Sequence, residues 1–231
     1  MTLLTISQDA ANIIGVPSPD AVTSSTDATN IQLLACANQE GRSLARSYRW
    51  EVLQKEGSFS TSAAESQGAM TTIASDFQRF LNNTMWNRTT DRKYYGPITD
   101  VEWQRIKATV SEGVTNYFRI RGGLLIVHPN PTASQSVFFE YISKNWVSGN
   151  ADKFTSDSQT SLLDEELITL GVVWRFLKIK GLPYDQQFQE YQVRRQEVSA
   201  QDGAKAVLRT GGPGLAILAV NEPEGNYAGV S

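Results

Sequence analysis

The chain has 231 residues, and its 21 lysines and arginines against 24 aspartates and glutamates give a formal net charge of −3. A hydrophobic share of 40% and a charged share of 19% are typical of a globular protein that can bury a core without metals or disulfides. With one cysteine and one histidine the chain cannot build a Cys/His zinc cluster, and its slight acidity argues against tight nucleic-acid binding through a strong basic patch.

Two helices are predicted at the start of the chain. The first covers residues 3–15, where apolar side chains recur at helical spacing until Gly15 and two prolines end it. The second covers about residues 28–54, with Thr26 or Asp27 as its N-cap. Their apolar stripes are Leu3, Ile6, Ala10, Ile13 and Ile14, and Leu33, Ala37, Leu44, Tyr48 and Val52. The small residues that would let another helix approach the second one closely are Ala35, Ala37, Gly41 and Ala45.

The middle of the chain is predicted to be rich in β-strands. Residues 57–98 contain many Thr, Ser, Asn and aromatic residues, which are typical of strands and turns. Thr99 and Glu102 form the capping-box pattern of a short helix over about residues 100–109.

A β-hairpin is the clearest local signal in the sequence. Two β-rich runs, NYFRIR and LLIVH, flank Gly122-Gly123, and two glycines accept the positive φ values of a primed turn. We expect a third run over residues 136–146 to pair with this hairpin.

Two more helices are predicted after a polar loop at residues 147–160. Ser161 and Asp164 form a second capping-box pattern before the first of them. Gly181 ends that helix, and Pro183 is suited to the first position of the last helix, which ends near Gly203. The buried sides are expected to be Leu163, Leu167, Leu170, Trp174 and Leu177 in the first helix, and Tyr184, Phe188, Tyr191 and Val198 in the second. The short turn between them predicts an antiparallel helical hairpin.

The predicted fold class is therefore α+β, an α-helical bundle with an inserted β-rich module and an extended C-terminal tail. We divide the chain into a bundle of residues 1–56 and 155–203, a module of residues 57–154 and a tail of residues 204–231. The tail has no usable periodicity, and GGPG interrupts its apolar stretch. Its candidate partner-binding residues are Leu208, Leu215, Ile217, Leu218 and Val220.

The acidic, histidine and cysteine side chains favour structural roles over catalysis. Asp164, Glu165 and Glu166 fall in a first helical turn, where the helix dipole favours negative charge. The sequence contains no nucleophile motif with which His128 could act as a catalytic base. Cys36 has the apolar neighbours of a core residue. We therefore expect no enzyme activity, no cofactor and no metal site.

The basic and aromatic residues leave binding hypotheses open. Arg119 and Arg121 alternate on the predicted hairpin and are interpreted as its solvent face, while Trp174 and Phe176 belong to an apolar helix surface. Sequence-independent DNA contact is a weaker alternative. The chain has five Trp and eight Tyr, and aromatic residues are enriched where proteins contact one another. The chain is therefore interpreted as a component of an assembly. A monomeric module that binds carbohydrate or peptide through the aromatic strands remains the alternative.

Five segments together resemble the head-to-tail adaptor, or connector, proteins of short-tailed bacteriophages. The resemblance runs through residues 25–53, 76–103, 118–123, 138–146 and 154–191. It includes STDATNIQLLACANQEGRSLARSYRWEVL, DFQRFLNNTMWNRTTDRKYYGPITDVEW and FTSDSQTSLLDEELITLGVVWRFLKIKGLPYDQQFQEY, whereas the C-terminal tail has no counterpart. No piece is a catalytic signature, but their order is fairly specific.

The resemblance implies a structural virion protein that forms a ring beneath the portal protein. Such a ring typically has 12 copies, meets a tail nozzle, tail tube or fibre proteins below, and lets genomic double-stranded DNA pass through its channel without sequence-specific binding. The implied location is the head-tail junction of the virion, after synthesis and assembly in the host cytoplasm. The sequence contains no run of about 20 apolar residues, so no membrane-spanning helix is predicted. Its first residues lack the basic segment of a signal peptide, so none is predicted either.

Overall fold

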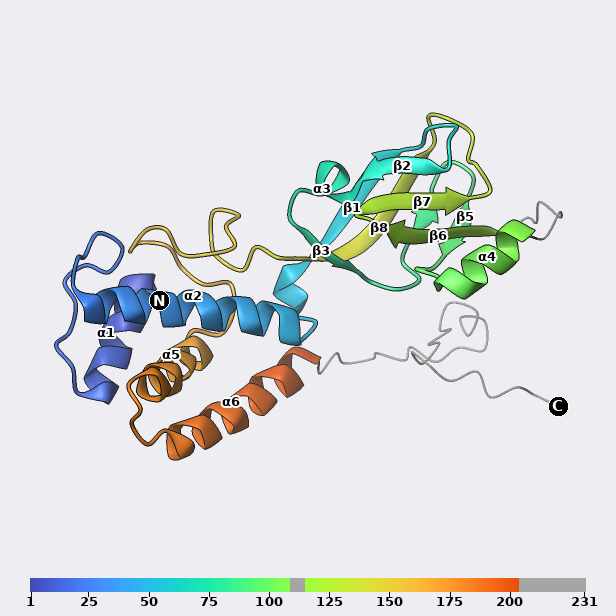
Figure 1. Cartoon of the computed structure of the whole chain (residues 1–231). Helices are drawn as coiled ribbons and strands as arrows, with labels where there is room; N and C mark the ends of the chain where they lie inside the picture. Colours follow the sequence, from blue (N-terminus) through green and yellow to red (C-terminus); the bar gives the residue numbers. More distant parts are fainter. Residues whose placement is uncertain (109–114, 204–231) are drawn as a thin grey trace, which may run out of the picture.

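A computed structural model describes residues 1–108 and 115–203 of the chain. The fold is α+β, as the sequence predicts, with helices from both ends of the chain beside a curled mixed β-sheet (Figure 1). The predicted tail, with GGPG and its five candidate residues, lies outside the described residues.

Four helices form one part of the molecule. They are α1 (Leu3–Ile14), α2 (Ala28–Ser47), α5 (Glu165–Ile179) and α6 (Asp185–Gly203). Helix α5 packs against each of the other three, and Figure 1 shows it lying between α2 and α6. Their buried faces meet in one hydrophobic core, which includes Ile6, Leu33, Leu44, Leu167 and Val172.

The second helix is shorter than predicted. It ends at Ser47, and after Tyr48 a 3-10 turn, η1 (Glu51–Leu53), leads into the sheet. The indole of Trp50 turns back and donates a hydrogen bond of 2.8 Å to the Leu44 carbonyl in the last turn of α2, which also accepts from the Ser47 hydroxyl. Val52 is therefore exposed rather than on the buried stripe, and Ile13 in α1 is exposed as well.

Close approach to α2 occurs at Gly41, but the partner is a tryptophan ring rather than a helix. A Cβ atom at Gly41 would lie 2.1 Å from the Trp146 ring. Trp146 is fully buried and contacts Phe154 edge to face, so the segment predicted as a polar loop also contributes to the helical core. The close helix approach is made from the other side, where Gly171 of α5 faces Glu40.

Within residues 1–108 and 115–203, the sheet has eight strands. They are β1 (Gln54–Ser60), β2 (Ser66–Ala69), β3 (Phe77–Phe80), β4 (Trp86–Asn87), β5 (Arg92–Tyr95), β6 (Asn116–Arg121), β7 (Leu124–His128) and β8 (Ser136–Ser143). Their order is β1-β8-β4-β5-β6-β7-β2, and β3 also pairs with β8. The β5–β6 pair is parallel and the others are antiparallel. Helix α3 (Met70–Ile73) follows β2, and α4 (Asp100–Ala108) follows β5.

The predicted hairpin is confirmed, but the predicted partner of β8 is wrong. Strands β6 and β7 pair across Gly122 and Gly123, which have φ values of +57° and +77°. Strand β8 does not pair with either of them; it pairs with β1 along seven residues and with β3 and β4 on its other side. Because the sheet curls, β8 meets the hairpin through side chains, and Phe139 and Phe118 share one core with Phe80.

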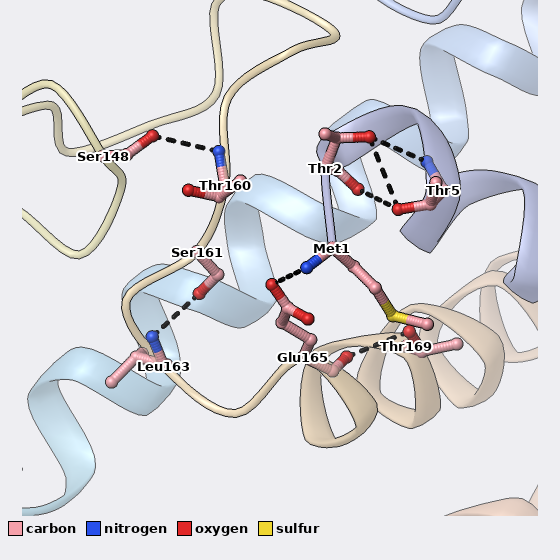
Figure 2. A network of polar contacts seen from close by, with 9 residues as sticks. All are labelled: Met1, Thr2, Thr5, Ser148, Thr160, Ser161, Leu163, Glu165 and Thr169. Atoms are coloured by element: carbon pink, nitrogen blue, oxygen red, sulfur yellow. Dashed lines mark hydrogen bonds and ion pairs between the residues drawn. The ribbon is translucent and has the colours of Figure 1, made fainter.

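Local capping explains where three helices begin. At α4 the capping box is confirmed, with Thr99 and Glu102 bonded in both directions. At α5 the cap is Asp164 alone, which accepts from the Leu167 amide at 2.8 Å; Ser161 instead accepts from the Leu163 amide in the preceding turn (Figure 2). Helix α6 begins at Asp185, two residues after Pro183, because the Tyr184 carbonyl accepts its first helical bond.

The start of the chain lies against the start of α5. Thr2 caps α1 and forms a β-bridge with Thr160, and the Met1 amino group donates to the Glu165 carboxylate (Figure 2). These contacts join α1 to the connection that leads from β8 to α5.

Candidate interaction surfaces

The acidic residues at the start of α5 form part of a polar network between helices. Asp164 caps the helix, and Glu165 and Glu166 stand in its first turn. From α6, Arg194 lies 3.0 Å from Asp164 and 2.9 Å from Glu166. The acidic cluster therefore stabilises the start of α5, where the helix dipole favours negative charge, as predicted.

Cys36 and His128 have the surroundings of structural residues. Cys36 is buried in the helical core, and burial raises the pKa of its thiol to about 11, so it is protonated at neutral pH. His128 ends β7 and lies edge-on to the Trp103 ring. Within residues 1–108 and 115–203, no three His, Cys, Asp or Glu side chains gather as metal ligands would.

Arg119 is buried, and its prediction as part of a solvent face is wrong. Its side chain is 5% exposed because α4 covers this end of β6. The guanidinium lies 4.5 Å from the centre of the Trp103 ring and donates to Asp100 at 2.7 Å. Arg119 therefore fixes α4 to the sheet, whereas Arg121 is exposed as expected.

Glu40 joins three helices from a fully buried position on α2. Its carboxylate accepts from Arg175 of α5 at 2.5 Å and from the Tyr191 hydroxyl of α6 at 2.6 Å. Burial raises the pKa of Tyr191, and the negative charge of Glu40 raises it further, so this hydroxyl stays a donor. The network fixes α2, α5 and α6 in one arrangement and so positions the surfaces on either side of them.

A basic groove lies along α2 and α5. It has a volume of about 520 Å³ and is lined by Gln39, Arg42, Ser43, Arg46, Ser47 and Arg175. Arg175 is held by Glu40, but Arg42 and Arg46 form no ion pair with any residue that the structure describes. Their charges are therefore available to a partner.

An acidic groove of similar volume lies between α5 and α6. It is lined by Glu166, Leu170, Gln186, Gln189, Glu190, Val193, Arg194 and Glu197, and also has a volume of about 520 Å³. Arg194 shares its one positive charge among Asp164, Glu166 and Glu197. The groove therefore keeps an excess of negative charge.

The sheet carries an aromatic groove of about 350 Å³. Its lining includes Glu56, Thr84, Trp86, Arg88, Phe138 and Glu140. The Trp86 side chain is 46% exposed, and the Arg88 guanidinium lies over the Phe138 ring and pairs with Glu56. An exposed indole beside charged groups is suited to a polar partner with an apolar face.

The comparison with known families decides what these surfaces belong to. Residues 1–213 match the family described as the SU10 adaptor protein. The chain belongs to the SU10 adaptor protein family. This confirms the resemblance to bacteriophage adaptors, so the chain is a structural adaptor protein and a component of the virion. No curated protein matches the sequence.

The family match includes the start of the sequence but not its last residues. It covers all the residues that the structure describes, and it ends at residue 213, before four of the five candidate docking residues. No helix in the described part of the chain is long and apolar enough to cross a membrane.

The three grooves were not predicted from the sequence. Arg42 and Arg46 are four residues apart, as are Gln186 and Glu190, so helical periodicity places each pair on one face. Periodicity alone does not show that Arg175 completes one groove and Glu166 the other, because these residues come from a different helix.

Proposed function

We propose that this member of the family joins the portal ring to the tail machinery as a homo-oligomeric ring of 12 copies, with genomic double-stranded DNA passing through its channel. The family match over residues 1–213 carries the proposal. The slight acidity of the chain supports it, because a channel with a strongly basic lining would retain DNA rather than let it slide.

The proposal assigns different contacts to different parts of the chain. Residues 1–56 and 155–203 form the ring wall, and residues 57–154 contact a tail nozzle, tail tube, fibre protein or neighbouring subunit. Two hydrophobic cores, one centred on the helices and one inside the curled sheet, support this division except at its second boundary, because Trp146, Val147 and Phe154 pack in the helical core.

The C-terminal tail is proposed to bind the portal or an adjacent subunit through its apolar residues. Its composition supports coupled ordering on a partner surface, which would keep the subunit monomeric until the portal ring is present. The substituted residues in the test are Leu208, Leu215, Ile217, Leu218 and Val220, all changed to Ser. We expect this variant to lose portal occupancy, whereas Asn221→Ser with Glu222→Ser, in the same tail, does not. Full occupancy by a deletion of residues 204–231 would refute the docking role.

The attachment itself is tested by co-sedimentation of the purified chain with portal rings from the same phage. Saturable binding at one adaptor per portal subunit is expected. A chain that stays in the supernatant at every concentration would overturn the proposed function.

The aromatic groove favours a second candidate, a β-module that binds carbohydrate or peptide. Its supporting observation is the exposed Trp86 ring beside Arg88 and Glu140. This candidate would be favoured over the adaptor ring if the chain bound glycan or peptide arrays but not portal rings, and if Trp86→Ala abolished the array binding.

A further inference from the structure

We propose that the basic groove of one copy binds the acidic α6 face of the next copy, so that these two surfaces form the contact between neighbours in the ring. The proposal rests on the proposed function, because it assumes that copies of the chain assemble side by side. Beyond that function, it identifies the two surfaces that meet and explains why two different faces of the chain form the contact.

The basic side of the contact is the exposed stripe of α2. Ile31, which is 51% exposed, and Ala35 precede Gln39, Arg42 and Arg46 along this face of the helix. Arg42 and Arg46 have no ion-pair partner among the described residues, and Arg175 is fixed beside them by buried Glu40. The surface thus offers a small apolar area followed by preorganised positive charge.

The acidic side is the exposed stripe of α6. Gln186, Glu190, Val193 and Glu197 follow one another at helical spacing, and Val193 is 56% exposed between two glutamates. Glu190 forms no ion pair with a described residue, and its carboxylate meets only the amide of Gln186. A helix with this stripe matches the α2 stripe in both charge and apolar content.

The two surfaces lie on different sides of α5. Glu166 lines the acidic groove and Arg175 the basic groove, and they are nine residues apart in the same helix. Nine residues make two and a half turns, so their side chains leave α5 in opposite directions. Surfaces that differ in charge and point apart cannot pair isologously across a twofold axis, but they can join head to tail, and such contacts form a ring when the rotation between neighbours closes.

Charge complementarity also predicts selectivity against wrong contacts. Two basic grooves or two acidic faces would repel each other, because like charges brought together at an interface disfavour the contact. The same charges keep the free chain from pairing symmetrically. We therefore expect portal-templated assembly to weaken as salt rises from about 0.1 M to 1 M, where the Debye length falls from about 10 Å to 3 Å.

Paired charge reversals test the contact. One variant carries Arg42→Glu with Arg46→Glu, and the other carries Glu190→Arg with Glu197→Arg. Arg175 is left in place because it holds buried Glu40. Each variant alone should fill portal rings at least tenfold more weakly than the wild type, with unchanged circular dichroism. A 1:1 mixture should recover full occupancy, because each reversed face then meets the reversed face of the other variant, and native mass spectrometry should find equal numbers of both chains.

A matched control separates the contact from net charge. Arg92→Glu with Arg121→Glu makes the same charge change as Arg42→Glu with Arg46→Glu, but on exposed residues of the sheet. Equal loss of assembly in this control, normal assembly by either helix variant, or a mixture that stays unassembled would each overturn the inference while wild-type rings still form. Failure of the wild-type chain to assemble on the portal would instead overturn the proposed function, and this contact with it.

Discussion

Asp76 provides a stability test that can be calculated from its surroundings. The carboxylate is 7% exposed and lies where β1 and β8 meet the segment before β3. It accepts from Lys55 at 2.6 Å and from the hydroxyls of Tyr141 and Ser143, each at 2.7 Å. Asp76→Asn keeps the shape of the side chain but removes the charge that these three donors stabilise. We expect it to destabilise the fold near neutral pH.

The size of the effect follows from the pKa of Asp76. Burial alone would raise this pKa, but the hydrogen bonds from Lys55, Tyr141 and Ser143 outweigh burial and lower it from 3.8 to about 2. Each pKa unit corresponds to about 1.4 kcal/mol, so the charged form contributes roughly 2 kcal/mol to the free energy of unfolding at pH 7. Because the folded pKa is lowered, this contribution is complete above the unfolded pKa and is lost as the pH falls from about 4 to about 2.

Urea unfolding of the wild type and Asp76→Asn between about pH 2 and pH 7 measures this contribution. The difference between them should be roughly 2 kcal/mol at pH 5–7 and should shrink steadily below about pH 4. Asp20→Asn, an exposed aspartate with no hydrogen bond to a described residue, serves as the control and should match the wild type. A difference that is absent at pH 7, or that does not change with pH, would refute the reasoning.

Three further predictions concern the helical part. Glu40→Ala should cost about 3 kcal/mol in urea unfolding because it removes the partner of both partly buried Arg175 and the Tyr191 hydroxyl, whereas Tyr191→Phe, which removes one hydrogen bond, should cost about 1–2 kcal/mol; equal costs would contradict the network. Gly41→Ala should lower the melting temperature, because the alanine Cβ would overlap the Trp146 ring. This loss should outweigh the higher helix propensity of alanine. A raised melting temperature would show that this contact is wrong. Cys36 should resist a thiol reagent at pH 8 in the folded chain and react fully in urea, because burial holds its thiol pKa near 11; rapid labelling of the folded chain would contradict that burial.

Features encoded by neighbouring residues were predictable from the sequence. Gly122-Gly123 between two β-rich runs makes a hairpin because the turn needs only those two residues in positive φ. Thr99 and Glu102 cap α4 because both bonds lie within one turn. The family resemblance, confirmed by the match over residues 1–213, depended on the order of several such local segments.

Features that depend on distant segments were not predictable. The alternation in β8 predicts a strand but does not say which strand pairs with it, and β1 rather than the hairpin provides the longest pairing. Arg119 alternates like a solvent-facing residue, yet Trp103 of α4 covers it. Arg42 and Glu190 sit on predictable helix faces, but the grooves also need Arg175 and Glu166 of α5, which packing alone brings to them.

The central claim, that the chain is an adaptor built into a ring on the portal, is tested most directly by native mass spectrometry. The purified chain should have the mass of a 25.5 kDa monomer alone, and with portal rings of the same phage it should form one complex containing 12 adaptor copies. A chain that remains monomeric and leaves the portal mass unchanged would contradict the claim.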